Sequence, residues 1–459
     1  MKRRSSNPWD AGSCNGRLFG ERKGWQAALL LTFLLGRSFF LSASDWPQWR
    51  GPERNGVAPE SPALANKPKL VWQKTTLMHG GSDTGHGSPV VAGERVYLYG
   101  SWNDSIAHDE VICLNAKTGS QVWRAVFPAD KRGEVRCQGS TPCVLDGRLY
   151  VAGRKRVYCL DAASGKLIWK QEIDCKSDGI ACSLAVVDGI AILICQGFYG
   201  FDALTGQVRW RRVEEPGPWN KNGTWGSYPS PIVWNHAGKN YVVCSCKYVE
   251  LIDPATGEAF WKLPWVEGGW SSWSGNSTPT IVGDKMVLMQ KEGGMEAYSL
   301  SVEGPGKLWH VPDHDVATSP LIYQGHVYTI GGGDYGKQAS IRCVDLLTGE
   351  LAWEKPTPPQ GCSSPVAADG KIIGFLNFGK ELGIWKADPS QYSALSTTPV
   401  NADGYSSMAF ADGRLYIRLR DGLACYDLTE RAKSANTRSD DFDTFFKKPV
   451  GQTPITGQN

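Results

Sequence analysis

Short runs of alternating apolar and polar residues recur along the chain, each followed by a polar turn and a second short run that ends in Trp. In one copy, Val157 to Leu160 is the first run, Asp161 to Gly165 is the turn, and the second run ends at Trp169. Period-two alternation is typical of β-strands. Asp and Ser side chains bond nearby backbone N–H groups and Gly adopts positive φ, so the middle segment favours a tight turn. Each copy therefore predicts a β-hairpin.

The hairpin belongs to a longer repeat. Four further hairpin copies are found at 115–119 with Trp123, 202–206 with Trp210, 253–257 with Trp261, and 345–349 with Trp353. A Ser/Thr-Pro motif followed by a Gly turn precedes the hairpins, at Ser88-Pro89, Thr141-Pro142, Ser230-Pro231, Thr278-Pro279, Ser319-Pro320 and Ser364-Pro365, with Leu184 and Met408 at the Pro position of two more units. The eight units are spaced by about 46 residues, a length typical of a four-stranded propeller blade.

The two ends of this repeat array complement each other. The eighth unit reaches Cys425 to Asp427 without a following Trp strand, whereas Leu70 to Gln73 is a Trp strand without a preceding hairpin. An N-terminal strand that completes the last blade would remove an exposed sheet edge. The predicted fold class is all-β, an eight-bladed β-propeller of four-stranded antiparallel blades whose ring is closed by an N-terminal strand. The expected structural blade tryptophans are Trp72, Trp123, Trp169, Trp210, Trp261, Trp309 and Trp353.

The sequence divides into four parts. Residues 1–44 carry basic residues, an apolar run and small residues in the order of a signal peptide, although Arg37 within the apolar stretch leaves a signal anchor open. Residues 45–69 are a Pro-rich lead-in whose Trp46 and Trp49 are expected to pack on the flank of the propeller, with a peptide-binding arm as the alternative. Residues 70–428 form the propeller, and 429–459 are a polar tail expected to be disordered. The predicted location is the periplasm or cell envelope.

Charge and cysteine content narrow the picture further. After residue 44 the chain holds 42 basic and 44 acidic residues, a balance that argues against a nucleic-acid partner. Four of the thirteen cysteines, Cys113, Cys159, Cys343 and Cys425, precede the turn by two residues in their repeats and are predicted to be buried free thiols. The alternative is one disulfide at a blade boundary, joining Cys137 to Cys143 or Cys175 to Cys182.

The repeats resemble those of the pyrroloquinoline-quinone (PQQ)-like propeller family over about residues 70–428. The features that carry the resemblance are the Ser-Pro-Val-Val run at 88–91, the Thr-Gly turns and the Trp strands. The run at 45–52 is similar to the lead-in of exported PQQ-like repeat proteins. The resemblance implies a propeller and two branches: PQQ- and calcium-dependent alcohol or sugar dehydrogenases, and the propeller lipoprotein that assembles outer-membrane proteins.

Neither branch is matched in full. The dehydrogenases use an adjacent Cys pair against the quinone, and this sequence has no Cys-Cys and no Cys-x-x-Cys-His haem motif. The resemblance therefore disfavours a PQQ and calcium cofactor, which stays as an alternative. Cys14 precedes the apolar run and is not placed as a lipid acceptor, so direct equivalence to the assembly lipoprotein is also disfavoured.

The segments leading into the first strand of each blade are rich in aromatic and polar residues, and a ring gathers them at one mouth of its channel. Such a rim suits a peptide, a glycan or an envelope protein through stacking and hydrogen bonds. The expected ligand rim is His86, Arg136, Gln138, Trp225, Tyr228, Trp270, Trp273, Asn276, His314 and Tyr405. The alternative is that these side chains fill long loops. No residue is predicted to be catalytic or to bind metal, and the predicted function is an exported non-catalytic binding or scaffold module.

Overall fold

The computed structural model describes residues 45–77, 85–102, 108–128, 139–153, 155–174, 180–213, 228–245, 248–264, 277–290, 294–312, 318–331 and 339–430. Within these ranges all of the named secondary-structure elements are β-strands, and they form eight four-stranded sheets. None of these residues forms a helix of the length and apolar character that crossing a membrane requires. The apolar run of the predicted signal segment lies outside the described residues.

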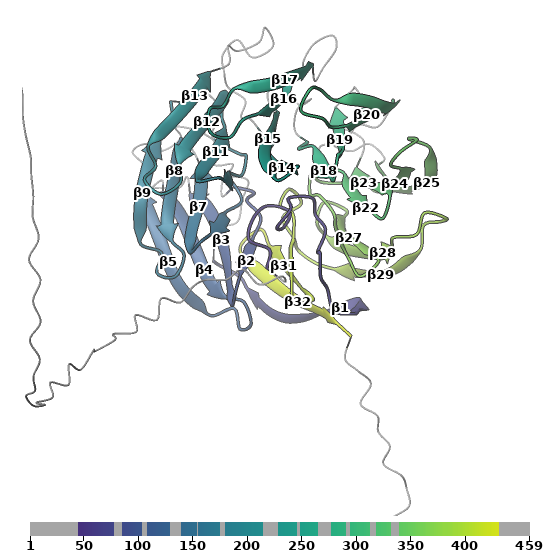
Figure 1. Ribbon diagram of the computed structural model, residues 1–459. Helices are drawn as coiled ribbons and strands as arrows, with labels where there is room; N and C mark the ends of the chain where they lie inside the picture. The colour runs from purple at the N-terminus through teal and green to yellow at the C-terminus, as the bar shows by residue number, and fades with distance from the viewer. Residues whose placement is uncertain are drawn as a thin grey trace, which may run out of the picture. The chain divides into compact units, whose positions relative to one another are not determined.

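The eight sheets follow one another around a ring as blades (Figure 1). Blades 1 to 4 are β2(Val90–Ala92), β3(Arg95–Trp102), β4(His108–Asn115), β5(Gln121–Pro128); β6(Cys143–Leu145), β7(Arg148–Gly153), β8(Arg156–Asp161), β9(Leu167–Glu172); β10(Ala185–Val187), β11(Ile190–Ile194), β12(Gly197–Asp202), β13(Val208–Val213); and β14(Ile232–His236), β15(Lys239–Ser245), β16(Tyr248–Ile252), β17(Ala259–Pro264). Blades 5 to 8 are β18(Thr280–Val282), β19(Lys285–Gln290), β20(Gly294–Ser299), β21(Gly306–Val311); β22(Leu321–Tyr323), β23(His326–Gly331), β24(Ala339–Asp345), β25(Leu351–Thr357); β26(Val366–Ala368), β27(Lys371–Leu376), β28(Glu381–Lys386), β29(Ala394–Pro399); and β30(Ala409–Ala411), β31(Arg414–Arg418), β32(Leu423–Thr429) with β1(Leu64–Lys74).

The last blade closes the ring as the repeat pattern predicts. β1 pairs antiparallel with β32, with Leu70 opposite Tyr426 and Trp72 opposite Cys425. A strand from the start of the described chain thus completes the sheet made by its end. The eight-bladed, all-β fold closed by an N-terminal strand is confirmed.

The hairpin turns form for local reasons. In the β8–β9 turn, Asp161 Oδ1 accepts the Ser164 N–H at 2.7 Å and the Ser164 hydroxyl at 2.6 Å. The Gly165 N–H then bonds the Asp161 carbonyl at 2.8 Å, with Gly165 at φ +73°. The turn sequence therefore satisfies its own backbone, and the strands on either side are brought into register.

Outer-strand tryptophans connect neighbouring blades. Trp169 of blade 2 donates its indole N–H to the Ala203 carbonyl of blade 3 at 3.0 Å, and its ring covers Gly206, where a Cβ would come within 2.6 Å of the ring. The other six indoles bond carbonyls in the same way: Trp72 to Ala116, Trp123 to Ala162, Trp210 to Pro254, Trp261 to Ser301, Trp309 to Leu346 and Trp353 to Asp388. Blade 7 has Ser396 at this register position, opposite Ile384.

The cysteines confirm the prediction of buried free thiols and contradict the alternative of a boundary disulfide. Cys113, Cys159, Cys343 and Cys425 are buried free thiols, which confirms the interpretation from the repeat. Both proposed boundary disulfides are wrong because Cys143 and Cys182 are free. Cys143 packs beside Gln48, with 3.7 Å between Sγ and Oε1, and the Cys182 thiol donates to the Ile194 carbonyl at 3.0 Å. Cys195, the residue after β11, is disulfide-bonded instead.

Candidate functional site: the central channel and its mouth

One Ser or Thr hydroxyl lies just before the innermost strand of every blade, and these eight residues form a closed ring of hydrogen bonds. In each bond the backbone N–H donates to the hydroxyl of the next blade. The bonds run from Ser88 to Thr141 (2.9 Å), Ser183 (3.0 Å), Ser230 (2.9 Å), Thr278 (3.0 Å), Ser319 (3.1 Å), Ser364 (3.0 Å), Ser407 (3.1 Å) and back to Ser88 (2.9 Å). Because the path returns to Ser88, this hydroxyl collar encircles the channel.

The collar explains the Ser/Thr-Pro motif. Proline is replaced by Leu184 and Met408 in two blades, yet Ser183 and Ser407 keep the hydroxyl. The hydroxyl is therefore the shared functional group of the motif. It satisfies a buried N–H at the edge of each blade, which would otherwise be costly to leave unpaired.

The lead-in lies inside the ring rather than on its flank, so that expectation is wrong. Trp46 is 1% exposed and exchanges two backbone hydrogen bonds of 2.9 Å with Val91 of β2. Pro47 accepts the Val144 N–H of β6 at 2.8 Å, and Gly56 accepts the Ala367 N–H of β26 at 2.8 Å. Figure 1 shows this purple segment crossing the middle of the ring. Innermost strands are sheet edges with unpaired backbone groups, and the lead-in pairs with them.

Two buried arginines of the same segment make hydrogen bonds to four further blades. Arg50 donates to the Thr280 hydroxyl and the Pro320 carbonyl, both at 2.7 Å. Arg54 donates to the Pro231 carbonyl at 3.2 Å and to the Leu184 carbonyl. Burial lowers the pKa of Arg50 to about 9. We call residues 45–56 the plug, because they contact blades 1 to 7 within the channel.

A charged cluster lies on the other side of the collar, where blade 8 meets blade 1. His86 precedes β2, Asp403 precedes β30, and Arg418 ends β31. His86 Nδ1 is 2.9 Å from Asp403 Oδ2, and Arg418 Nε is 3.8 Å from the same oxygen. Arg418 also donates to the carbonyls of Gly87 at 2.8 Å and Tyr99 at 2.9 Å. The exposed Tyr405 ring lies against the His86 ring, with 4.7 Å between centroids.

Close backbone packing holds Asp403 in place. The Asp403 N–H donates to the Arg418 carbonyl, and the Ala402 N–H to the Gly379 carbonyl, both at 2.9 Å. Both blades have a glycine at this contact, since a Cβ on Gly404 would lie 2.9 Å from the Phe378 carbonyl oxygen and a Cβ on Gly379 would lie 2.7 Å from the Ala402 carbonyl oxygen. The carboxylate is therefore fixed by two blades before any ligand arrives.

The two basic side chains of the cluster stabilise the ionised form of Asp403. Burial raises the pKa of Asp403, but the hydrogen bond and charge of His86 and the charge of Arg418 outweigh it, so the pKa lies below the ordinary 3.8. Burial and then the charge of Asp403 raise the pKa of the neighbouring Cys362 thiol to about 11. With Nδ1 held by the carboxylate, the His86 ring has a fixed orientation and its Nε2 atom is directed away from Asp403.

The structure brings together two of the expected rim residues, His86 and Tyr405. Tyr228 is half-buried two residues before the collar residue Ser230. Seven further rim residues lie outside the described residues: Arg136, Gln138, Trp225, Trp270, Trp273, Asn276 and His314. Asp403 and Arg418 were missed from the sequence. The one available signal was a charged residue, Arg418, that ends an apolar strand and is followed by Leu419.

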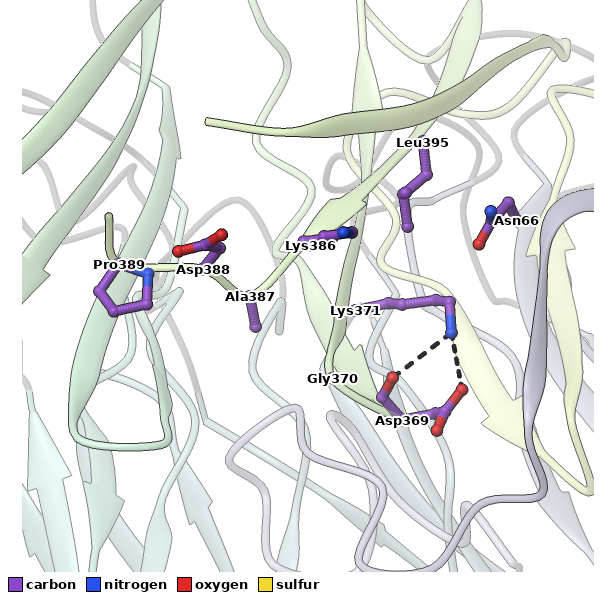
Figure 2. A pocket seen from close by; sticks show the side chains of 9 residues that line it. All are labelled: Asn66, Asp369, Gly370, Lys371, Lys386, Ala387, Asp388, Pro389 and Leu395. Atoms are coloured by element: carbon purple, nitrogen blue, oxygen red, sulfur yellow. Dashed lines mark hydrogen bonds and ion pairs between the residues drawn. The ribbon is translucent and has the colours of Figure 1, made fainter. Parts of the chain in front are cut away.

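A second surface feature lies at the seam between blades 7 and 8. A cleft of about 450 Å³ is lined by Asn66, Asp369, Gly370, Lys371, Lys386, Ala387, Asp388, Pro389 and Leu395 (Figure 2). Lys371 Nζ bonds Asp369 Oδ2 at 2.7 Å, and the same carboxylate oxygen accepts the Leu64 N–H at 2.8 Å. This cleft is on the side of the hairpin turns, away from the Asp403 cluster.

Comparison with known proteins identifies the family. The family model described as outer membrane protein assembly factor BamB matches residues 63–140, 107–243 and 245–382. The chain belongs to this family. The PQQ-like resemblance of the repeats is thereby confirmed.

Relatives of this BamB-like family fall into two groups. The outer membrane protein assembly factor BamB of Burkholderia pseudomallei is 25% identical over 377 residues, covering 78% of this chain and 90% of the relative. The 1-butanol dehydrogenase (quinone) of Thauera butanivorans is 27% identical over 296 residues, covering 56% of this chain and 46% of the relative. The match to this dehydrogenase thus covers under half of its length.

Solved structures share the fold at low identity. BamB from Moraxella catarrhalis has a TM-score of 0.60 at 14% identity, covering 78% of this chain and 99% of that structure. A europium-containing methanol dehydrogenase has a TM-score of 0.67 at 13% identity, covering 82% and 90%. These similarities show a BamB-like and dehydrogenase-like propeller.

The described channel residues do not fit the calcium ion that a PQQ site would need. Calcium takes six to eight oxygen ligands. Within the described ranges, no group of three or more His, Cys, Asp or Glu side chains could hold a metal ion. Asp403 is the carboxylate of the described cluster, and it already bonds His86 with the Arg418 guanidinium 3.8 Å away.

Proposed function

We propose that this chain is an exported, non-catalytic binding propeller of the cell envelope, which captures an envelope protein at the mouth that carries His86 and Tyr405. The observation that carries the proposal is a pair of partly exposed rings, of which His86 is held by the buried Asp403 carboxylate and Tyr405 lies against His86. The Asp403 side chain is 11% exposed and the His86 side chain 31%. Rigid aromatic groups suit recognition because little conformational entropy is lost on binding.

Two further features favour a protein partner. The BamB of Burkholderia pseudomallei, a relative over most of its length, is described as an outer membrane protein assembly factor. The plug bonds groups on the turn side of the collar, and His86 and Tyr405 lie on the other side, where the loops that carry Trp270 and Trp273 are expected to gather. The signal-like segment of residues 1–44 supports export to the periplasm.

The test is capture from envelope extract by the immobilised chain starting at Asp45, with bound proteins identified and then re-tested as purified components. We expect a double variant, His86→Ala with Tyr405→Ala, to lower retention of the identified partner at least about tenfold, as hot-spot residues do. Lys117→Ala, at an exposed hairpin turn, is the matched control. If the double variant folds and retains its partner as the wild type does, the mouth is not the binding surface.

The alternative is a quinoprotein alcohol dehydrogenase, favoured by the similarity to the 1-butanol dehydrogenase (quinone). It is tested by adding PQQ and calcium and following reduction of an electron-accepting dye by primary alcohols. Dye reduction that needs both additions and the alcohol would establish this alternative and would overturn the non-catalytic proposal.

A further inference from the structure

The seam between blades 7 and 8 differs from the other seven seams in its outer layer. Elsewhere the outer-strand Trp bonds a carbonyl in the β-hairpin turn of the next blade. In blade 8 the third and outer strands are β32 and β1, which come from opposite ends of the described chain and have no connecting turn. Blade 7 accordingly carries Ser396, whose hydroxyl bonds the Asn66 carbonyl. A smaller side chain at this seam leaves room beside it.

The cleft of about 450 Å³ lies at this seam. Its walls come from two turns of blade 7 together with Leu395 of β29 and Asn66 of β1. Figure 2 shows the Lys386 side chain pointing toward the side on which Leu395, Asn66 and Lys371 lie. Leu395 is a partly buried apolar residue packed against the core, so the cleft has an apolar floor beside its polar groups.

The cleft lining holds two lysines and two aspartates, and further lysines follow the lining residue Asn66 on β1. Lys67 and Lys69 are exposed on β1 directly after Asn66, and Lys386 is exposed on blade 7. Lys67 and Lys69 make no ion pair with another described residue, whereas the charge of Lys386 acts on the Asp388 carboxylate and Lys371 is paired with Asp369. An acidic segment could therefore gain ion pairs with Lys67 and Lys69 without breaking an existing one, and would share Lys386 with Asp388.

The tail of the chain leaves the propeller beside this cleft. Thr429 pairs with Leu64, and the Glu430 N–H donates to the Ala63 carbonyl at 2.9 Å. Leu64 in turn donates to Asp369, which lines the cleft. Nine residues after Glu430, the sequence reads Ser-Asp-Asp-Phe-Asp-Thr-Phe-Phe at 439–446, with three carboxylates and three phenylalanines, between Arg438 and the pair Lys447 and Lys448.

We propose that residues 439–446 dock in the seam cleft, with at least one phenylalanine ring against Leu395 and the aspartates facing Lys67, Lys69 and Lys386. The tail then supplies an aromatic group at the seam whose outer strand lacks a tryptophan. The eight intervening residues, 431–438, span up to roughly 26–29 Å when extended, and a short tether gives an effective concentration in the millimolar range. Even weak contacts are sufficient under those conditions.

The first test separates the segment from the propeller. A fluorescent peptide of residues 439–446, which carries the three aspartates without the flanking basic residues, is titrated into the chain that lacks 431–459, and its anisotropy is followed. We expect saturable binding that weakens with added salt, because exposed ion pairs are screened. A peptide with Ser in place of Phe442, Phe445 and Phe446 should not bind. Absence of saturable binding by the natural peptide would overturn the proposal.

The second test places the peptide. Leu395→Asp and Lys386→Glu in the truncated chain should each weaken peptide binding about threefold to tenfold. Leu167→Asp, at an exposed position of β9 in blade 2, is the matched control. In the full chain, a photo-crosslinking phenylalanine analogue at position 395 should attach to residues 436–449 in the same molecule. If neither seam variant weakens peptide binding, or if crosslinks form only between molecules, intramolecular docking in the cleft is contradicted.

Discussion

Trp169 shows at the residue scale how one side chain joins two blades. It is 7% exposed, bonds the Ala203 carbonyl and lies over Gly206 of the next blade. Trp169→Ala should remove this contact and leave a cavity, lowering the free energy of unfolding by about 3–5 kcal/mol. Urea denaturation measures the change. Leu167→Ala, 41% exposed on the same strand, should have little effect, and equal midpoints for both variants would mean that Trp169 does not hold the seam.

Asp403 gives a prediction about pH. Its pKa in the folded chain lies below 3.8, so the carboxylate contributes stability that is present above that value and is lost as the pH falls through the lower folded pKa. Asp403→Asn keeps the shape but removes the charge beside Arg418 and His86. The variant should be less stable at pH 7 by about 1–3 kcal/mol.

The difference in unfolding free energy between wild type and Asp403→Asn should shrink below about pH 4, because the Asp403 carboxyl of the unfolded chain takes up a proton there while that of the folded chain is still ionised. Thermal melting from pH 7 to pH 3 measures this difference. Asp412→Asn, at an exposed turn position, is the control and should follow the wild type. A stability difference between wild type and Asp403→Asn that stays constant down to pH 3 would show that ionisation of Asp403 does not stabilise the fold.

At the element scale, each innermost strand is held to the next blade by one collar hydroxyl. Ser230 accepts the Ser183 N–H at 2.9 Å and is 4% exposed. Ser230→Ala should leave that N–H unpaired and cost about 1–2 kcal/mol of unfolding free energy. Ser230→Thr should be tolerated, because Thr141 and Thr278 fill the same position in other blades. Equal loss from both substitutions, measured by urea denaturation, would point to packing rather than the hydroxyl.

Strands and hairpins were predictable because their causes are local. The Asp161 turn and the alternation before it fix one hairpin within thirteen residues, and the same pattern repeats along the chain. The plug was not predictable in this way. Arg50 and Arg54 donate to the carbonyls of Leu184, Pro231 and Pro320, which are 130 to 270 residues away in the sequence. The lead-in has no periodic pattern from which these partners could be predicted.

At the scale of the whole molecule, the candidate site depends on closure of the ring. His86 and Asp403 are 317 residues apart in sequence and meet because blade 8 lies next to blade 1. The repeat count predicted that adjacency and so predicted that His86 and Tyr405 share one mouth. It did not reveal that Asp403 and Arg418 support them, because a carboxylate in a loop and an arginine at a strand end occur at many positions without such a partnership.

Closure and the plug can be separated by two truncations. A chain that starts at Pro62 keeps β1 and loses the plug, whereas a chain that starts at Thr75 loses both. β1 pairs with β32 along Leu64 to Lys74, and its Trp72 bonds Ala116 of blade 1, so its loss exposes the edge of β32 and opens the seam to blade 1. An unpaired edge strand recruits other chains. The Thr75 chain should therefore aggregate during size-exclusion chromatography.

The Pro62 chain should remain monomeric but melt at a lower temperature, because the Val91 and Ala367 backbone groups, paired with the plug in the full chain, become exposed in the channel. The chain that starts at Asp45 is the reference for both. A monodisperse Thr75 chain that melts with the Pro62 chain would mean that β1 is dispensable for closure. Equal melting of the Pro62 and Asp45 chains would instead mean that the hydroxyl collar holds the inner strands without help from the plug.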